Sequence, residues 1–164
     1  TGLVHGDIKP ENVLINSYNW LSLCDISQAD KPVYCMDDNL EQYNKHYGFL
    51  NNNERCYFAP ERWRSPPTTR EQFKKENERA DLQKPMDIFS LGCVIAEILF
   101  MDAAPLFNLV KLNDLRKGSF DTKRALEDSA LKDDPVIVDL ILKMVEADPK
   151  KRPTIDVCLR EWLQ

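Results

Sequence analysis

The segment Met86–Phe100 constrains the fold more than any other stretch of this chain. It reads MDIFSLGCVIAEILF, and apolar residues occupy nearly all of its faces when it is drawn as a helix. A surface helix carries its apolar residues on one stripe, whereas a helix that is apolar on nearly all sides is buried. We therefore expect a buried central helix here.

Three further segments carry helical signals. The first opens at Ala104 and ends near Gly118, and its apolar positions at helical spacing are Leu106, Leu109, Val110, Leu112 and Leu115. The second starts at Asp134-Pro135 by capping chemistry, and its predicted buried stripe is Val136, Ile137, Leu140, Ile141 and Met144. The third is capped by Thr154, and its apolar residues are Ile155, Val157, Leu159, Trp162 and Leu163.

Two short, mostly apolar strands are predicted near the start of the chain. They are Val13–Ile15 and Leu21–Cys24, and Asn16–Asn19 is the turn between them. Such a hairpin carries Asn12 at its start and Asp25 at its end. Both side chains would then lie at the same edge, where a shared cation would offset the cost of crowding polar oxygens.

The residues around this hairpin are those that phosphoryl transfer requires. Asp7 would take or orient a hydroxyl proton, and Lys9 would steady the moving phosphoryl group. Asn12 and Asp25 would supply the hard oxygen ligands that Mg²⁺ prefers. The alternative for any one of them is an ordinary hydrogen-bonded loop residue, which is the commoner case for a single polar side chain in a turn.

Composition limits the other possibilities. The chain has 164 residues, of which 43% are hydrophobic and 30% charged, so it can bury one core and is most simply one domain. Its net charge of -5 makes nucleic acid an unexpected partner. Five cysteines lie far apart with no Cys-x-x-Cys pair, which favours reduced thiols in the cytosol over a zinc site. No stretch approaches the ~20 apolar residues of a membrane span.

Two stretches look irregular. Residues 26–61 have little periodicity and many loop formers, which predicts a long surface loop. Residues 65–84 are almost without apolar side chains, and we interpret them as a solvated insertion with no chemistry of its own.

Several motifs together resemble eukaryotic protein kinases. The segment His5–Asn12 is similar to the kinase catalytic loop, and Lys9 within it resembles the serine/threonine branch. Tyr57–Glu61 resembles the Ala-Pro-Glu end of the activation segment, and Arg152 matches the arginine that pairs with that glutamate. Asp87 matches the helical aspartate that braces the catalytic-loop backbone.

This resemblance covers almost the whole chain and implies an α+β, protein-kinase-like fold. The chain would be its mainly α-helical C-terminal lobe, with a short β-hairpin at the catalytic loop. The implied divisions are 1–25 for the catalytic loop and metal-binding hairpin, 25–61 for the activation segment, 65–84 for the insertion and 86–164 for the helical subdomain. The implied cofactors are ATP, with GTP as the alternative, and Mg²⁺.

The resemblance also assigns roles to residues. Asp7 and Lys9 are the implied catalytic residues. Nucleotide binding is implied for Lys9, Asn12 and Asp25, and metal binding for Asn12 and Asp25. Structural support is implied for His5, Glu61, Asp87 and Arg152.

One branch is more similar than kinases at large. The chain resembles the kinase-like regulatory subunits of class III phosphatidylinositol 3-kinase at His5–Lys9, Asn19-Trp20, Cys56–Arg62, Met86–Ser90, Pro105–Phe107, Arg116 and Gly118–Phe120. This resemblance implies the lipid kinase catalytic subunit and autophagy and endosomal adaptor subunits as partners. It also implies a cytoplasmic protein, peripheral on endosomal and autophagic membranes through regions absent from this sequence. Because the match begins almost at Thr1, we expect a fragment.

Departures from the kinase pattern leave three hypotheses open. Ser27 stands where kinases have glycine, Gly6 where they have arginine, and residues 53–56 lack a usual threonine. The first hypothesis is a serine/threonine kinase that modifies itself or a partner. The second is a nucleotide-binding pseudokinase scaffold that positions the lipid kinase, and the third is a pseudogene or truncated gene. Without a Gly-rich loop and a strand lysine, the fragment alone is expected to be inactive.

Overall fold

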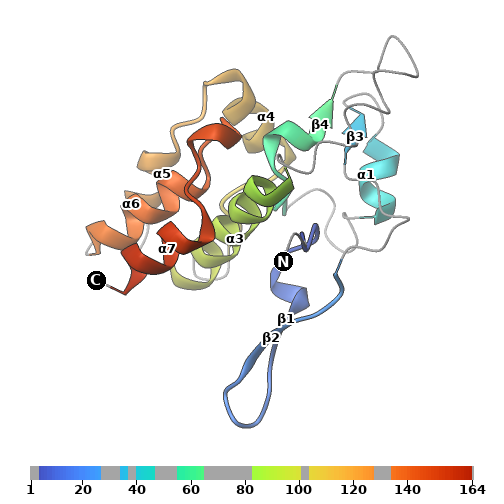
Figure 1. Cartoon of the computed structure of the whole chain (residues 1–164). Helices are drawn as coiled ribbons and strands as arrows, with labels where there is room; N and C mark the ends of the chain where they lie inside the picture. Colours follow the sequence, from blue (N-terminus) through green and yellow to red (C-terminus); the bar gives the residue numbers. More distant parts are fainter. Residues whose placement is uncertain are drawn as a thin grey trace.

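A computed structural model describes residues 4–26, 34–36, 40–46, 55–64, 83–100, 104–127 and 134–163. The described part is mostly helical with two small sheets (Figure 1). Its strands are β1 Val13–Ile15, β2 Leu21–Leu23, β3 Cys35–Met36 and β4 Trp63–Arg64. Its α-helices are α1 Leu40–His46, α3 Gln83–Phe100, α4 Leu109–Lys117, α5 Thr122–Glu127, α6 Pro135–Met144 and α7 Ile155–Trp162. Short 3₁₀ turns span Pro10–Asn12, Pro60–Arg62 and Pro149–Lys151.

Helix α3 is the buried central helix that the sequence predicts, and it lies between the N-terminal segment on one side and helices α5, α6 and α7 on the other (Figure 1). Its fully or nearly buried residues are Met86, Ile88, Phe89, Ser90, Cys93, Val94, Ala96 and Glu97. Burial ends near its C-terminus, where Ile98 is 60% exposed. The helix begins at Gln83, so residues 83 and 84 belong to it and not to the predicted insertion. Residues 65–82 lie outside the described residues.

Local chemistry sets the ends of α4. Asn108 caps the helix by accepting a hydrogen bond from the Lys111 N–H at 2.8 Å. Gly118 ends it in the left-handed conformation, with φ of 72°, as the sequence predicts. The helix begins at Leu109, later than the predicted opening at Ala104, because the cap follows the buried pair Leu106 and Phe107.

Helix α6 begins as predicted, with Asp134 accepting from the Ile137 N–H. The predicted buried stripe is correct for Leu140, Ile141 and Met144, but Val136 is wrong because it is 59% exposed. At 100° per residue, Val138 shares the inward face with Ile141 and takes the buried place instead. Helix α7 follows Thr154, which stands at the N-cap without a side-chain cap hydrogen bond.

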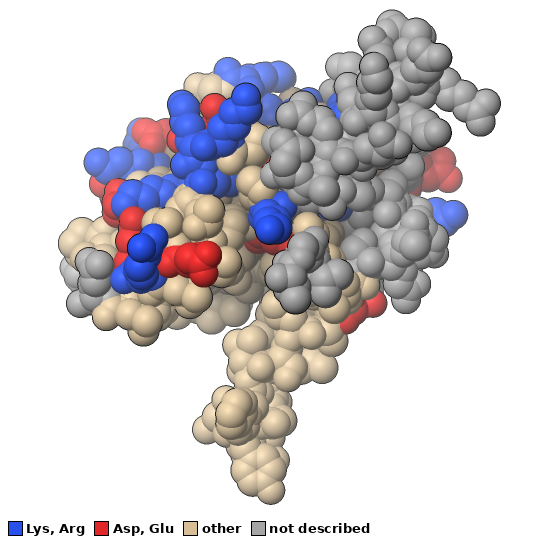
Figure 2. All heavy atoms as spheres, in the orientation of Figure 1, with Lys and Arg blue, Asp and Glu red and all other residues tan. Residues whose placement is uncertain are grey.

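The predicted hairpin is present and projects from the helical body (Figures 1 and 2). Strands β1 and β2 pair antiparallel, with Val13 opposite Leu23 and Ile15 opposite Leu21. In the turn, the Asn16 side chain accepts hydrogen bonds from two backbone N–H groups. The hairpin exposes the large apolar residues Leu14, Ile15, Tyr18, Trp20, Leu21 and Leu23. Ile26, which comes after β2, is exposed as well.

The prediction of a surface loop over 26–61 is wrong for the parts that the structure describes. Strand β3 pairs in parallel with β4, which comes 28 residues later, Trp63 lying opposite Cys35. Tyr43 of α1 packs in an aromatic cluster with Phe58 and Trp63, at ring distances of 5.0–5.5 Å. Elements of two and seven residues are too short to show a period in the sequence. Ser27 and the residues 47–54 lie outside the described part.

Five cysteines are free, and four of them are buried. Burial raises the pKa of the Cys35 thiol to about 11, which keeps it protonated and unreactive at neutral pH. Among the described residues, no cluster of three or more histidines, cysteines and acidic residues could hold a metal ion. None of the described helices has the length and apolar character needed to cross a membrane.

Candidate functional site

Helix α3 fixes the start of the His5–Asn12 loop through hydrogen bonds to the loop backbone. The Asp87 carboxylate accepts hydrogen bonds from the backbone N–H of His5 at 2.6 Å and of Gly6 at 2.9 Å. Gly6 has φ of 77°, a left-handed conformation that glycine adopts at no steric cost. The bracing contact expected of Asp87 is therefore present, and it ties the loop to the most buried helix of the molecule.

Three predicted site residues meet at the centre of this loop. Asp7 and Asn12 are 6% and 5% exposed, although both are polar. The Asn12 side-chain N–H₂ donates to the Asp7 backbone carbonyl at 2.7 Å and lies 3.4 Å from the Asp7 carboxylate. The Lys9 ammonium is 3.2 Å from the same carboxylate. Asp7 is thus a buried carboxylate whose charge is balanced by a neighbouring cation.

Asp25 is brought to the same end of the hairpin as Asn12. The Cys24 N–H donates to the Asn12 carbonyl at 2.9 Å, one residue before Asp25 and one residue after β2. A His5 ring nitrogen lies 3.0 Å from the Cys24 carbonyl and links this strand end to the loop. Asp25 itself has φ of 58°, an uncommon conformation for a residue with a side chain and one that is enriched at functional sites.

The oxygens of Asn12 and Asp25 are of the chemical type that magnesium ions take as ligands. Because the Asn12 amide nitrogen faces Asp7, its amide oxygen lies on the opposite edge of the side chain. That oxygen and the Asp25 carboxylate are hard ligands of the kind that Mg²⁺ takes, usually together with water and substrate phosphates. The donor set is therefore chemically suited to a nucleotide-bound cation.

A pocket open to solvent lies beside Asp7, and the empty space of about 260 Å³ within its outline includes part of that solvent. Its lining residues are Asp7, Ile8, Lys9, Tyr43, Tyr57, Phe58, Arg62 and Ser90. The loop supplies three of these residues, and most of the others come from the segment 55–64. A group entering the pocket would meet the Asp7 and Lys9 side chains together.

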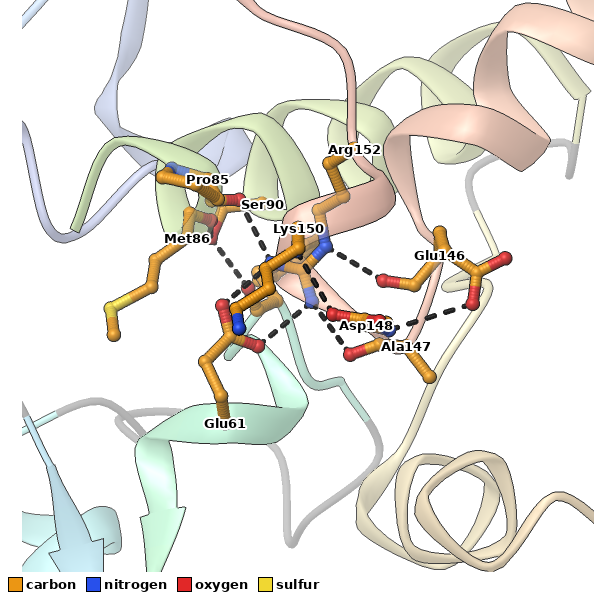
Figure 3. A network of polar contacts seen from close by, with 10 residues as sticks. Glu61, Pro85, Met86, Ser90, Glu146, Ala147, Asp148, Lys150 and Arg152 are labelled. Atoms are coloured by element: carbon orange, nitrogen blue, oxygen red, sulfur yellow. Dashed lines mark hydrogen bonds and ion pairs between the residues drawn. The ribbon is translucent and has the colours of Figure 1, made fainter. Parts of the chain in front are cut away.

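The segment carrying Glu61 is fixed by Arg152, as the resemblance implied (Figure 3). The two side chains form a bidentate ion pair, with N–O distances of 2.6 and 2.8 Å. Arg152 also donates to the backbone carbonyls of Pro85, Glu146 and Ala147. One buried guanidinium therefore joins the 55–64 segment, the start of α3 and the turn that follows α6.

The sequence interpretation missed Glu97, a buried acid on α3 that is only 3% exposed. It lies 3.1 Å from the Arg55 guanidinium and accepts a hydrogen bond from the Tyr57 hydroxyl. Burial, followed by the contact with Glu97, raises the pKa of that hydroxyl. The Ser90 hydroxyl donates to the Tyr57 carbonyl at 2.7 Å. The available signal was one acid within the apolar stretch Leu91–Phe100, since a buried charge requires a partner.

Arg62 was also missed as a site residue. It is 3% exposed, and its guanidinium donates to the Gly6 carbonyl at 2.9 Å. The same guanidinium lies 3.7 Å above the centre of the Phe58 ring. No local pattern distinguished it, because its partner is 56 residues earlier in the chain.

Comparison with known proteins agrees with this arrangement. The profile of the protein kinase domain matches residues 1–163. The chain is 40% identical over 162 residues to serine/threonine-protein kinase VPS15 of Saccharomyces cerevisiae, covering 98% of this chain and 10% of that protein. It is 40% identical to the protein of that name in Schizosaccharomyces pombe and 37% identical to that of Arabidopsis thaliana, with 98% of this chain covered in both. The chain spans about 9% and 10% of the length of those two relatives. The chain therefore belongs to the protein kinase domain family and is related to the VPS15 serine/threonine kinases.

Proposed function

We propose that this chain is the C-terminal lobe of a serine/threonine protein kinase domain that transfers phosphate from ATP. The observation that carries the proposal is the buried Asp7 carboxylate, 3.2 Å from Lys9 and beside Asn12, at the hairpin end that carries Asp25. The proposed divisions are the loop and hairpin over 1–25, an activation segment over 25–61, an insertion over 65–84 and the helical subdomain over 86–164. The last two residues of the insertion, 83 and 84, form the start of α3.

Each site residue then has a role that follows from its chemistry. Asp7 would accept or orient the proton of the attacking hydroxyl, and Lys9 would contact the transferred phosphoryl group. Asn12 and Asp25 would hold the cation through their oxygens. Bound nucleotide and Mg²⁺ would supply the phosphoryl group and neutralise its negative charge. His5, Glu61, Asp87 and Arg152 would keep these groups in place without touching the substrate.

We further propose that the whole protein is the regulatory subunit of a class III phosphatidylinositol 3-kinase complex. The support is the identity of 37% to 40% with proteins named VPS15, together with the motifs that this chain shares with such subunits. Its partners would be the lipid kinase catalytic subunit and autophagy and endosomal adaptors. It would act in autophagy and endosomal sorting, in the cytoplasm and peripherally on endosomal and autophagic membranes.

A second candidate is a nucleotide-binding scaffold with little or no turnover. It is favoured by Gly6, since this position carries no side chain that could pair with a phosphorylated activation segment. The Gly6 carbonyl is held instead by Arg62, within the protein. Under this alternative, the site would hold nucleotide and keep the domain in shape for its partner.

Phosphotransfer from labelled nucleotide by the full-length protein with its lipid-kinase partner tests the proposal. We expect Asp7→Asn to lower the rate by roughly 100- to 10,000-fold, because it removes the proposed general base. Asp25→Asn should abolish labelling through loss of a cation ligand. Asp139→Asn, an exposed acid on α6, is the matched control and should leave the rate unchanged.

Labelling that is absent, or insensitive to both substitutions while the complex still assembles, would replace the kinase proposal with the scaffold. The isolated 164-residue chain should show no phosphotransfer in the same assay.

A further inference from the structure

We propose that Arg62 is a positioning residue that anchors the Gly6–Asp7 peptide and thereby aims the Asp7 carboxylate into the pocket. The inference rests on the proposed role of Asp7, and it concerns a residue to which neither the motifs nor the comparisons assign a part in the reaction. It is carried by the contacts on the two ends of one peptide group.

The Gly6–Asp7 peptide is held at both of its polar atoms. Its carbonyl accepts from the Arg62 guanidinium at 2.9 Å, and its N–H, on Asp7, lies 3.3 Å from a ring nitrogen of His5. Because a peptide group is planar, fixing these two atoms fixes the plane from which the Asp7 side chain departs. The Asp7 carbonyl on the next peptide is in turn held by Asn12 at 2.7 Å.

Gly6 makes this anchor necessary. Glycine with φ of 77° has more accessible backbone conformations than any other residue, so the peptide that follows it is not fixed by local sterics. Asp87 accepts from the backbone N–H groups of His5 and Gly6, and both groups belong to peptides that precede the Gly6–Asp7 peptide. Among the described residues, Arg62 is the contact from outside the loop that restrains the carbonyl of the Gly6–Asp7 peptide.

Arg62 is itself held rigidly. Its guanidinium stacks at 3.7 Å over the Phe58 ring, and its backbone N–H donates to the Ala59 carbonyl at 3.0 Å. The neighbouring Glu61 is fixed by its ion pair with Arg152. A buried guanidinium at 3% exposure is costly unless it is well bonded, and its planar fork suits a carbonyl and a ring face at once.

The anchor also joins the two halves of the proposed site. It connects the end of the activation segment to the catalytic loop through a cation that is always charged. Positioning of Asp7 would then depend on this permanent contact rather than on a phosphate added to the activation segment.

The test uses the full-length protein with its lipid-kinase partner and the variants Arg62→Met and Arg62→Lys. We expect Arg62→Met to lower kcat by about 10- to 100-fold with little change in KM for nucleotide, because the base is misplaced while the cation ligands remain. Arg62→Lys should lie between wild type and Arg62→Met. Arg64→Met is the matched control, since Arg64 stacks on Tyr34 at 3.4 Å and should leave kcat unchanged.

Two readouts separate positioning from general stabilisation. Amide hydrogen exchange should rise in the loop over residues 5–8 in Arg62→Met and stay unchanged in α6 over residues 135–144. In the Asp7→Asn background, Arg62→Met should add less than about a twofold further loss, because the group that it positions has been removed. If Arg62→Met does not fold, Arg62→Lys carries the same two readouts.

Unchanged kcat and loop exchange in Arg62→Met, or an equal loss with and without Asp7→Asn, would overturn the inference while Asp7→Asn alone still lowers activity. Phosphotransfer that is unaffected by Asp7→Asn would instead overturn the proposed function. Increased exchange confined to the loop would in that case support Arg62 as the anchor of the Gly6–Asp7 peptide and remove its part in catalysis.

Discussion

At the scale of single residues, the site depends on polar side chains that reach across the chain to satisfy backbone groups. Asp87 binds two N–H groups of the loop, and Arg152 binds three carbonyls as well as Glu61. The Arg152 side chain is completely buried and that of Glu61 is 15% exposed. Removing one partner of such a pair leaves the other charge without compensation, which costs more than the pair itself contributes.

We therefore expect Arg152→Met to lower the free energy of unfolding of the complete kinase domain by about 3–5 kcal/mol. Urea denaturation measures this loss. Lys143→Met is the control, because Lys143 pairs with Asp139 and Glu161 on the exposed surface and its removal should hardly move the midpoint. A midpoint for Arg152→Met that matches the control would contradict the assignment.

At the scale of elements, the contact between α3 and α6 sets the geometry of the helical body. Gly92 lies where α6 ends, and a Cβ built there would be 2.9 Å from both Met144 Cβ and Val145 Cγ1. Real side chains do not approach this closely, so glycine is what permits the two helices to pack. The other described glycine of the helical body, Gly118, has open space around it and is required only for its φ of 72°.

Gly92→Ala should destabilise the domain by about 1–3 kcal/mol, because overpacking outweighs the better helix propensity of alanine. Thermal denaturation of the variants at Gly92 and at Gly118 measures the change in melting temperature at each position. Gly118→Asn should be tolerated, since asparagine adopts the left-handed conformation, whereas Gly92→Asn should be worse than Gly92→Ala. A rise in melting temperature for Gly92→Ala would show that the two helices can separate without cost.

Across the whole molecule, the hairpin projects as an arm without charged side chains from a body whose described surface carries many of them (Figure 2). Ile15 is 68% exposed, Trp20 is 72% exposed and Tyr18 is 81% exposed. Isolated two-stranded hairpins are marginally stable in water, and a contiguous apolar patch promotes association. The chain by itself therefore carries a surface that favours contact with other molecules.

We expect the isolated chain to self-associate as its concentration rises, and the double variant Ile15→Thr with Trp20→Thr to shift it toward the monomer. Threonine keeps the strand propensity while removing apolar area. Sedimentation velocity over a concentration series measures the change. Val110→Thr is the control, because Val110 is 69% exposed on α4 but stands outside the hairpin. A monomeric wild-type chain at high concentration would contradict this expectation.

Features that depend on neighbours along the chain could be predicted from the sequence. The two hairpin strands and their turn, the Asp134 cap, the Gly118 stop and the burial of α3 follow from turn chemistry, capping and periodicity over a few residues. The pairing of Glu61 with Arg152, 91 residues apart, was foreseen only because a family resemblance supplied it.

Contacts between segments far apart in the sequence could not be predicted in this way and are seen only in the folded chain. Arg62 reaches Gly6 across 56 residues and Tyr57 reaches Glu97 across 40, while Val138 takes the buried place predicted for Val136. No local pattern encodes these choices, because each side chain finds its partner only after the helices and the 55–64 segment have packed. The free energy of a buried charge depends on what surrounds it in space, and the order of residues along the chain does not record that.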